Sequence, residues 1–188
     1  MSRIAIDARH NLYNPKEITM KFFSANIDSL RELYVNQLQM LLSAEQQITE
    51  ALPTMIEKAT DVQLKEAFQS HLQETREQIT RLERILQKET GGSDTVKCKV
   101  LDALVDEAED MISDASDESV RDAALIAAAQ RVEHYEIAAY GAVRHFARIL
   151  NENTAAELLD RTIKEEGHAD HLLTEIASRV NTYADKAA

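Results

Sequence analysis

Residues 121–141 read RDAALIAAAQRVEHYEIAAYG, and residues 158–177 read LLDRTIKEEGHADHLLTEIA. Both stretches are rich in Ala, Leu and Glu, which favour α-helix. The segment 151–154, Asn-Glu-Asn-Thr, is a polar turn signal between them. This part of the chain is therefore expected to form two antiparallel helices joined by a short turn.

Each of these helices carries a pair of potential metal ligands. The first contains Glu133-x-x-Glu136 and the second contains Glu165-x-x-His168. The two pairs are placed symmetrically about the turn, so all four groups are expected at one level of the hairpin. A carboxylate-bridged dimetal site inside a helical bundle requires this arrangement.

The remainder of the chain extends the helical pattern to a whole domain. The 188 residues include only 4 Gly and 2 Pro and no Trp, a composition that favours an all-α protein. Helices are expected near 29–59, 60–90, 118–150 and 154–180, with a short extra helix within 96–112. Two hairpins joined by a long link predict a ferritin-like four-helix bundle, with the short helix on the crossover.

Three regions are expected along the chain. Residues 1–27 show no sustained period and read as an N-terminal arm. Residues 28–180 form the bundle domain, and residues 181–188 form a C-terminal tail.

Charge and composition limit the classes of partner. The net charge of -12 argues against nucleic acids and anionic membranes, because their phosphates would be repelled. The sequence has no apolar run of membrane-spanning length and no signal-peptide pattern at its start. Cys98 is the single cysteine, so no disulfide framework is expected and a cytoplasmic location is predicted.

Two glutamates interrupt apolar helical stripes. The stripe of the first helix is apolar except for Glu45, and that of the third is apolar except for Glu136. An ionised carboxylate is too costly to bury alone, so each is neutral, paired with a cation or bound to metal. The alternative is that the bundle is splayed and these groups reach water.

The first hairpin offers further ligands at the same level. Glu74 lies opposite Glu45 across the turn near Thr60, and His71 lies one helical turn before Glu74. A small rotation of the last helix would turn Glu166 inward in place of Glu165. The predicted metal ligands are Glu45, His71, Glu74, Glu133, Glu136, Glu165 and His168. A site with many carboxylates and few imidazoles suits iron or manganese better than structural zinc. The predicted cofactor is therefore a pair of metal ions, which are both iron, both manganese or one of each.

Four segments resemble the YciE/YciF-type ferritin-like bacterial stress proteins. They are 34–55, 71–86, 121–141 and 158–177, within a match over about 28–178. The resemblance implies a rubrerythrin-like dimetal centre and a homodimer. His71-x-x-Glu74 reverses the Glu-x-x-His order of rubrerythrins, and members of the closer family often lack a ligand where this chain has His168. Since the sequence contains no rubredoxin-like cysteine cluster, no built-in electron-transfer domain is expected, and the sequence does not identify the redox partner.

Two functions follow as hypotheses. In the first, a dimetal centre, with iron as the expected metal, reacts with peroxide or dioxygen during stress. In the second, the bundle is a non-enzymatic stress module that binds a protein partner, with structural metal or none.

Overall fold

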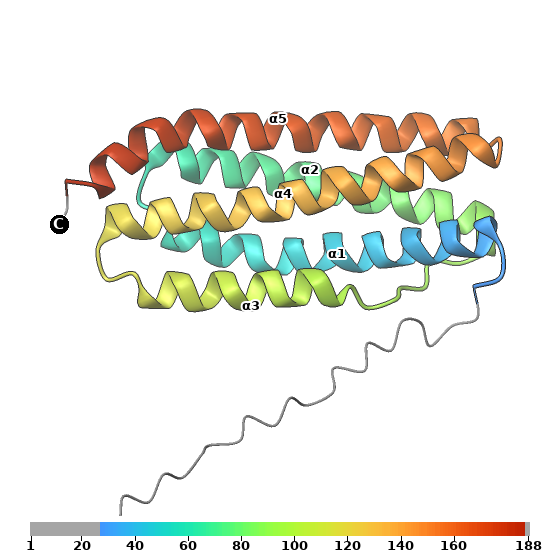
Figure 1. Ribbon diagram of the computed structural model, residues 1–188, viewed down its shortest axis with the longest axis horizontal. Helices are drawn as coiled ribbons and strands as arrows, with labels where there is room; N and C mark the ends of the chain where they lie inside the picture. The colour runs from blue at the N-terminus through green and yellow to red at the C-terminus, as the bar shows by residue number, and fades with distance from the viewer. Residues whose placement is uncertain (1–26, 187–188) are drawn as a thin grey trace, which may run out of the picture.

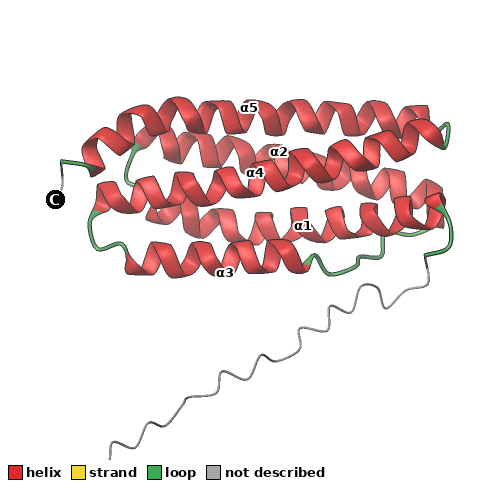
Figure 2. Ribbon diagram, in the orientation of Figure 1, coloured by secondary structure: helices red, strands yellow, loops and turns green. Residues whose placement is uncertain are grey.

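The computed structural model describes residues 27–186, and these residues contain helices and loops but no strands (Figure 2). The expectation about the arm 1–27 falls almost wholly outside them. The helices in chain order are α1 (Leu30–Lys58), α2 (Val62–Thr90), α3 (Lys99–Asp114), α4 (Glu118–Ile149) and α5 (Asn153–Ala184). The predicted all-α class is confirmed, and α5 continues a few residues beyond its expected end.

Most helix ends follow local sequence signals. The Ser29 side chain accepts a hydrogen bond from the backbone N–H of Glu32 and so caps α1. Gly91 ends α2 in the left-handed conformation, with φ 79°, which glycine adopts without steric strain. Asp61 caps α2 through its side chain, and Glu152 precedes α5 without a side-chain cap. The helices expected from about 60 and 154 thus begin at Val62 and Asn153.

The topology is that of a ferritin-like bundle (Figure 1). Short turns make α1 antiparallel to α2 and α4 antiparallel to α5, while α1 also packs on α4 and α2 packs on α5. The link after α2 returns the chain along the bundle, so that α4 runs parallel to α2. This is the crossover that the length of the link predicted.

The crossover helix α3 covers the side formed by α1 and α4. Its N-terminal end is fixed at Cys98, whose side chain is buried. The Cys98 N–H donates to Ser43 Oγ at 3.2 Å, and the Cys98 carbonyl accepts from Gln47 Nε2 at 3.3 Å. These contacts fasten the start of α3 to the middle of α1.

The interior contains two apolar clusters separated by a polar layer. One cluster includes Ile48, Phe68 and Leu173 and lies toward the α1–α2 turn. The other includes Leu41 and Leu159 and lies toward the α4–α5 turn. Between them lie buried acidic side chains from three of the four bundle helices.

Within residues 27–186, none of the helices is both long and apolar enough to pass through a bilayer.

Candidate metal centre

The polar layer is built from residues that occupy core positions of the helices. Glu45 lies seven residues from Leu38 and from Leu52, and all three are buried. Seven residues make nearly two helical turns, so such residues share one face. The same spacing places His71 between Leu64 and Gln78, Glu136 between Ala129 and Val143, and Glu166 between Leu159 and Leu173.

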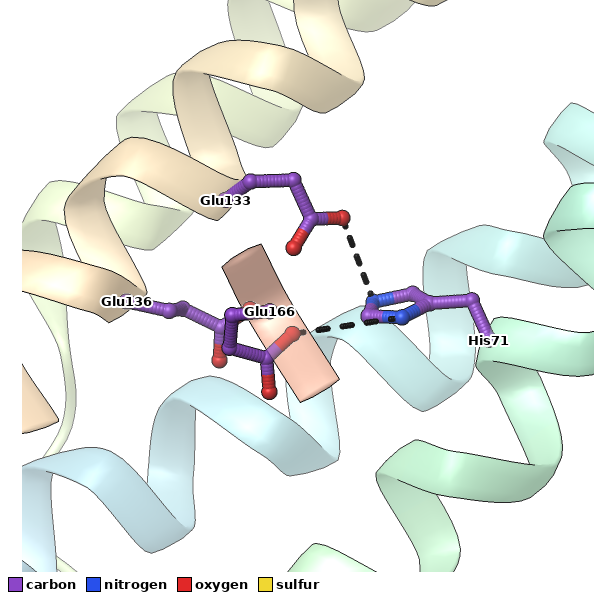
Figure 3. A group of neighbouring side chains, drawn as sticks. All are labelled: His71, Glu133, Glu136 and Glu166. Carbon is purple, nitrogen blue, oxygen red and sulfur yellow. Dashed lines mark ion pairs between the residues drawn. The ribbon is translucent and has the colours of Figure 1, made fainter. Parts of the chain in front are cut away.

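Four side chains converge within this layer (Figure 3). His71 of α2, Glu133 and Glu136 of α4, and Glu166 of α5 each offer a ligand atom, and these atoms all lie within 4.8 Å of one another. His71 Nε2 is 3.4 Å from Glu133 Oε1, and His71 Nδ1 is 4.0 Å from Glu166 Oε2. All four residues are buried.

Glu45 of α1 adds a fourth carboxyl group to the layer. It is fully buried, and Glu45 and Glu136 perturb each other's pKa. The phenol of Tyr140, also fully buried, donates a short hydrogen bond to Glu45 Oε1. Tyr140 is therefore a hydrogen-bond donor to the layer as well as a buried aromatic side chain.

Most of the polar atoms of the layer lack hydrogen-bond partners. They are Glu45 Oε2, both nitrogens of His71, Glu133 Oε2, both oxygens of Glu136, and Glu166 Oε2. Buried polar atoms in folded proteins are nearly always paired, so a concentration of unpaired atoms at one place requires a specific reason. The contacts of His71 with Glu133 and Glu166 are close but do not have hydrogen-bond geometry.

Burial changes the acidity of every group in the layer. It raises the pKa of Glu45, Glu133 and Glu136 well above the ordinary carboxyl value, and the neighbouring carboxylates raise it further. It raises the pKa of Glu166 to about 7 and lowers that of His71 to about 4. Burial disfavours the charged form of each group, so without a cation the layer favours protonated carboxyls and a neutral imidazole.

Glu165 and Glu166 have different hydrogen-bond partners at the edge of the layer: arginines bind Glu165, and a glutamine binds Glu166. Arg81 donates to both oxygens of Glu165, at 2.5 and 2.9 Å, and Arg161 donates to it at 3.0 Å. Burial alone would raise the pKa of Glu165, but these hydrogen bonds lower it below its ordinary value. Gln78 Nε2 donates to Glu166 Oε1 at 2.5 Å and so holds that carboxyl inside the bundle.

The structure places the seven predicted ligands in two groups. Glu45, His71, Glu133 and Glu136 lie in the buried layer, as expected. Three others do not join it: Glu165 is paired with arginines, His168 is exposed, and Glu74 is half-buried outside the cluster. The expectation that Glu165 faces the interior is wrong, because α5 is rotated so that Glu166 occupies the core position. His134 and His145 are exposed.

Sequence reasoning missed the polar residues that surround the layer. Gln78 and Arg81 were not identified, although Gln78 lies seven residues after His71 and so had to face the same interior. The same spacing test could not choose between Glu165 and Glu166. Leu159 and Leu173 lie seven residues to either side of Glu166, and Leu158 and Leu172 lie at the same spacing from Glu165. Symmetry about the turn could not decide this point, because neighbouring residues of a helix differ in direction by about 100°.

The donor set fits metal ions. Glu45, Glu133, Glu136 and Glu166 provide oxygen ligands and His71 provides one imidazole, a combination that suits iron or manganese. The unpaired oxygens and nitrogens of these five residues are the atoms that such ions would bind. The assignment of individual ligands remains a prediction.

The chain is similar to characterised bacterial proteins over nearly its whole length. It is 38% identical to the protein YciF of Escherichia coli strain K12 over 165 residues, which are 87% of this chain and 99% of the relative. The crystal structure of that stress protein matches with a TM-score of 0.79 and 37% identity, covering 83% of this chain and 99% of the relative.

A second solved structure, YcfI of Rhodopseudomonas palustris, matches with a TM-score of 0.78 and 40% identity, covering 81% of this chain and 98% of that chain. The resemblance inferred from the four segments is thus confirmed. Residues 29–185, which include all five helices, match one sequence family, and the chain belongs to that family, described as a domain of unknown function (DUF892).

Proposed function

We propose that the buried layer binds two divalent transition-metal ions, iron in preference to manganese, and that the protein uses them in a stress response. The observation that carries the proposal is the set of unpaired ligand atoms on Glu45, His71, Glu133, Glu136 and Glu166. Unpaired acids gathered in a protein interior destabilise the fold unless they serve another purpose. Binding cations is the purpose that their chemistry supports.

Charge balance favours two ions over one. The layer contains four buried carboxyl groups, and its only basic side chain, His71, is neutral at pH 7 because its pKa is about 4. Arg81 is engaged with Glu165 and Glu77 at the edge. Two divalent cations would balance all four groups as carboxylates, whereas with a single ion two of the four would have to stay protonated, because net negative charge is costly in a medium of low dielectric constant.

The residues have separable roles in such a site. His71, Glu133, Glu136 and Glu166 form the set that can surround one ion, and Glu45 brings the additional carboxylate that a second ion requires. Tyr140 would orient Glu45, and Gln78 would orient Glu166. Partners of this kind fix ligand direction and adjust metal affinity.

Bound iron would supply electrons for the reduction of dioxygen or a peroxide. The protein contributes a site shielded from bulk water, with Tyr140 as the nearest phenolic proton donor to the carboxylates. The role in stress rests on the relative in E. coli, which is described as a stress protein. The homodimer implied by the resemblance is part of the same proposal, and light scattering after size exclusion tests it.

An anaerobic titration tests the metal proposal. Purified protein without metal should bind two Fe(II) ions per chain saturably, as measured by calorimetry. Glu136→Gln should weaken binding strongly, because Glu136 is fully buried with both oxygens unpaired. Glu157→Gln is the matched control, since Glu157 is exposed on α5. Absence of saturable binding by the unmodified protein would reject the proposal, and binding without any later oxidation by dioxygen or peroxide would reject the redox part alone.

A further inference from the structure

A cavity of about 60 Å³ lies under the crossover helix and ends at the polar layer. We call it the α3 cavity. Its walls come from α1, α2, α3 and α4, and the part contributed by α3 consists of Leu104, Val105, Ala108, Glu109 and Ile112. The inner end is formed by His71 and Glu133. The cavity therefore joins an apolar space to two candidate ligands.

The chemistry of the walls disfavours water. Leu52, Phe68, Ile112 and Val132 are among the residues that surround the space, and none of them offers a hydrogen bond. A buried water molecule typically makes about three hydrogen bonds, and apolar cavities that cannot supply them stay dry. The polar residues that line the space are His71 and Glu133 at its inner end and Thr54 and Glu109, which are exposed; the other walls are apolar and suit an apolar occupant.

The volume limits the size of that occupant. A cavity needs about 10–15 Å³ to hold one water molecule, whereas a cavity that holds benzene has about 150 Å³. At about 60 Å³ the α3 cavity exceeds the first limit and is well below the second. A second space beside the same His71 and Glu133, on the side of α2 and α5, has only about 20 Å³. The α3 cavity is therefore the roomier approach to this pair.

We propose that the α3 cavity binds dioxygen and presents it to the candidate metal site at His71 and Glu133. Dioxygen is small and apolar and makes no strong hydrogen bonds, so a space lined mainly by hydrocarbon is a better environment for it than water. The reaction of dioxygen at the metal site rests on the proposed function, but dioxygen can occupy the α3 cavity without metal. In this reading the crossover helix closes an oxidant-binding space as well as connecting the two hairpins.

Xenon, an apolar probe of similar size, tests the cavity directly. Crystals of the full chain without added metal, pressurised with xenon, should show anomalous density between Ile112 and Val132. Ordered water filling the space, or absence of xenon there, would overturn the inference. Since this experiment involves no iron, its failure leaves the metal proposal standing, and failure of the iron titration leaves the xenon result interpretable.

Cavity-filling variants provide the second test. Ala108→Leu adds a larger side chain to the wall contributed by α3, and Val105→Phe is an alternative at the same wall. Ala103→Leu is the matched control, because Ala103 is exposed on the same helix. Either filling variant should lose the xenon density, and the control should retain it.

The same variants separate dioxygen from a polar oxidant. In iron-loaded protein the filling variants should slow Fe(II) oxidation by dioxygen several-fold while Fe(II) binding stays unchanged. Oxidation by hydrogen peroxide, which is polar, should be little affected. Equal slowing with both oxidants, or no slowing with dioxygen, would contradict a dioxygen site in the α3 cavity.

Discussion

Glu165 and Glu166 are neighbours in sequence and have opposite environments. Glu165 accepts hydrogen bonds from Arg81 and Arg161 at the bundle edge, whereas Glu166 is fully buried and held by Gln78. A carboxylate that already balances two arginines has little to gain from a metal ion, while an unpaired buried one has much to gain. Chemical type alone therefore does not identify a ligand; its surroundings do.

This contrast yields a matched pair of variants. Glu166→Gln should reduce Fe(II) affinity by more than the 10–100-fold typical of losing an outer partner of a ligand, because it removes a ligand itself. Glu165→Gln should change affinity by less than about threefold, since that side chain lies outside the cluster. Calorimetry under anaerobic conditions measures both. A larger loss in the Glu165 variant would restore Glu165 as the ligand of α5.

The candidate site could be predicted from the sequence where residue spacing matched the core positions. Glu45 and Glu136 were identified because each interrupts an apolar stripe, and both are fully buried. Glu165 and His168 were selected by symmetry about the turn, which fixes the level along the bundle but not the rotation of a helix about its axis. That rotation depends on packing, including the contact of Arg81 with Glu165, which lies 84 residues away in sequence.

The turn between α1 and α2 is fastened by a carboxylate from another helix. Asp122, near the start of α4, is only 3% exposed. Its Oδ1 accepts from the backbone N–H of Thr60 at 2.8 Å, and its Oδ2 accepts from Thr60 Oγ1 at 2.6 Å and from the N–H of Asp61 at 2.8 Å. One side chain thus joins the two hairpins at this end of the bundle.

Removal of that carboxylate should destabilise the whole bundle. Asp122→Ala leaves three donors without their partner, and we expect a loss of about 3 kcal/mol in the free energy of unfolding, given about 1–3 kcal/mol for each unsatisfied buried group and partial relaxation toward water. Urea denaturation of metal-free protein measures it. Asp110→Ala, at an exposed position on α3, should change stability by less than about 0.5 kcal/mol. Equal stability of the two variants would show that the turn does not depend on Asp122.

At the level of helices, the sequence defined ends that have strong local signals. The Ser29 side chain caps α1, and Gly91 ends α2 in the left-handed conformation, close to the expected helix bounds. At the ends expected near 60 and 154, Asp61 caps α2 and Glu152 precedes α5 without a side-chain cap. The Thr60 hydroxyl instead donates to Asp122, a contact made by the folded bundle that local sequence could not indicate.

The order of helices in the whole molecule follows from the lengths of the links. Short links require antiparallel neighbours, and the long one lets α4 start at the end of the bundle opposite to where α2 ends (Figure 1). The position of α3 over α1 and α4 was not predicted, because a crossover of that length can cover several faces. Its contacts at Cys98, with Ser43 and Gln47, determine the face that it covers.

The acidic layer also makes the stability of the whole molecule depend on pH when metal is absent. The pKa of Glu45, Glu133 and Glu136 is raised well above its ordinary value by burial, and that of Glu166 is raised to about 7. The folded protein therefore binds more protons than the unfolded chain once the pH exceeds the ordinary carboxyl value. For such groups the free energy of unfolding falls as pH rises toward the folded pKa values.

His71 acts in the opposite direction at lower pH. Burial lowers the pKa of His71 from 6.5 to about 4. Between these two pH values the imidazole is protonated in the unfolded chain but not in the folded protein. The stability contributed by His71 is therefore lost as the pH falls from about 6.5 to about 4. Above about pH 6.5 this contribution is complete, and the carboxyl groups alone determine the slope. The range from about pH 6.5 to about pH 8.5 thus isolates the acidic layer.

Metal-free protein should consequently become less stable across that range, by up to about 1.4 kcal/mol per pH unit for each carboxyl that the folded state keeps protonated. Thermal unfolding at several pH values in the presence of a chelator measures the trend. Glu136→Gln should flatten it, because the amide needs no proton, while Glu157→Gln should not. Saturating Fe(II) or Mn(II) under anaerobic conditions should reverse the trend, since metal binding displaces those protons and tightens as pH rises. A metal-free protein whose stability is constant or rises across the range would mean that these carboxyls are ionised and hydrated, which contradicts a closed acidic interior.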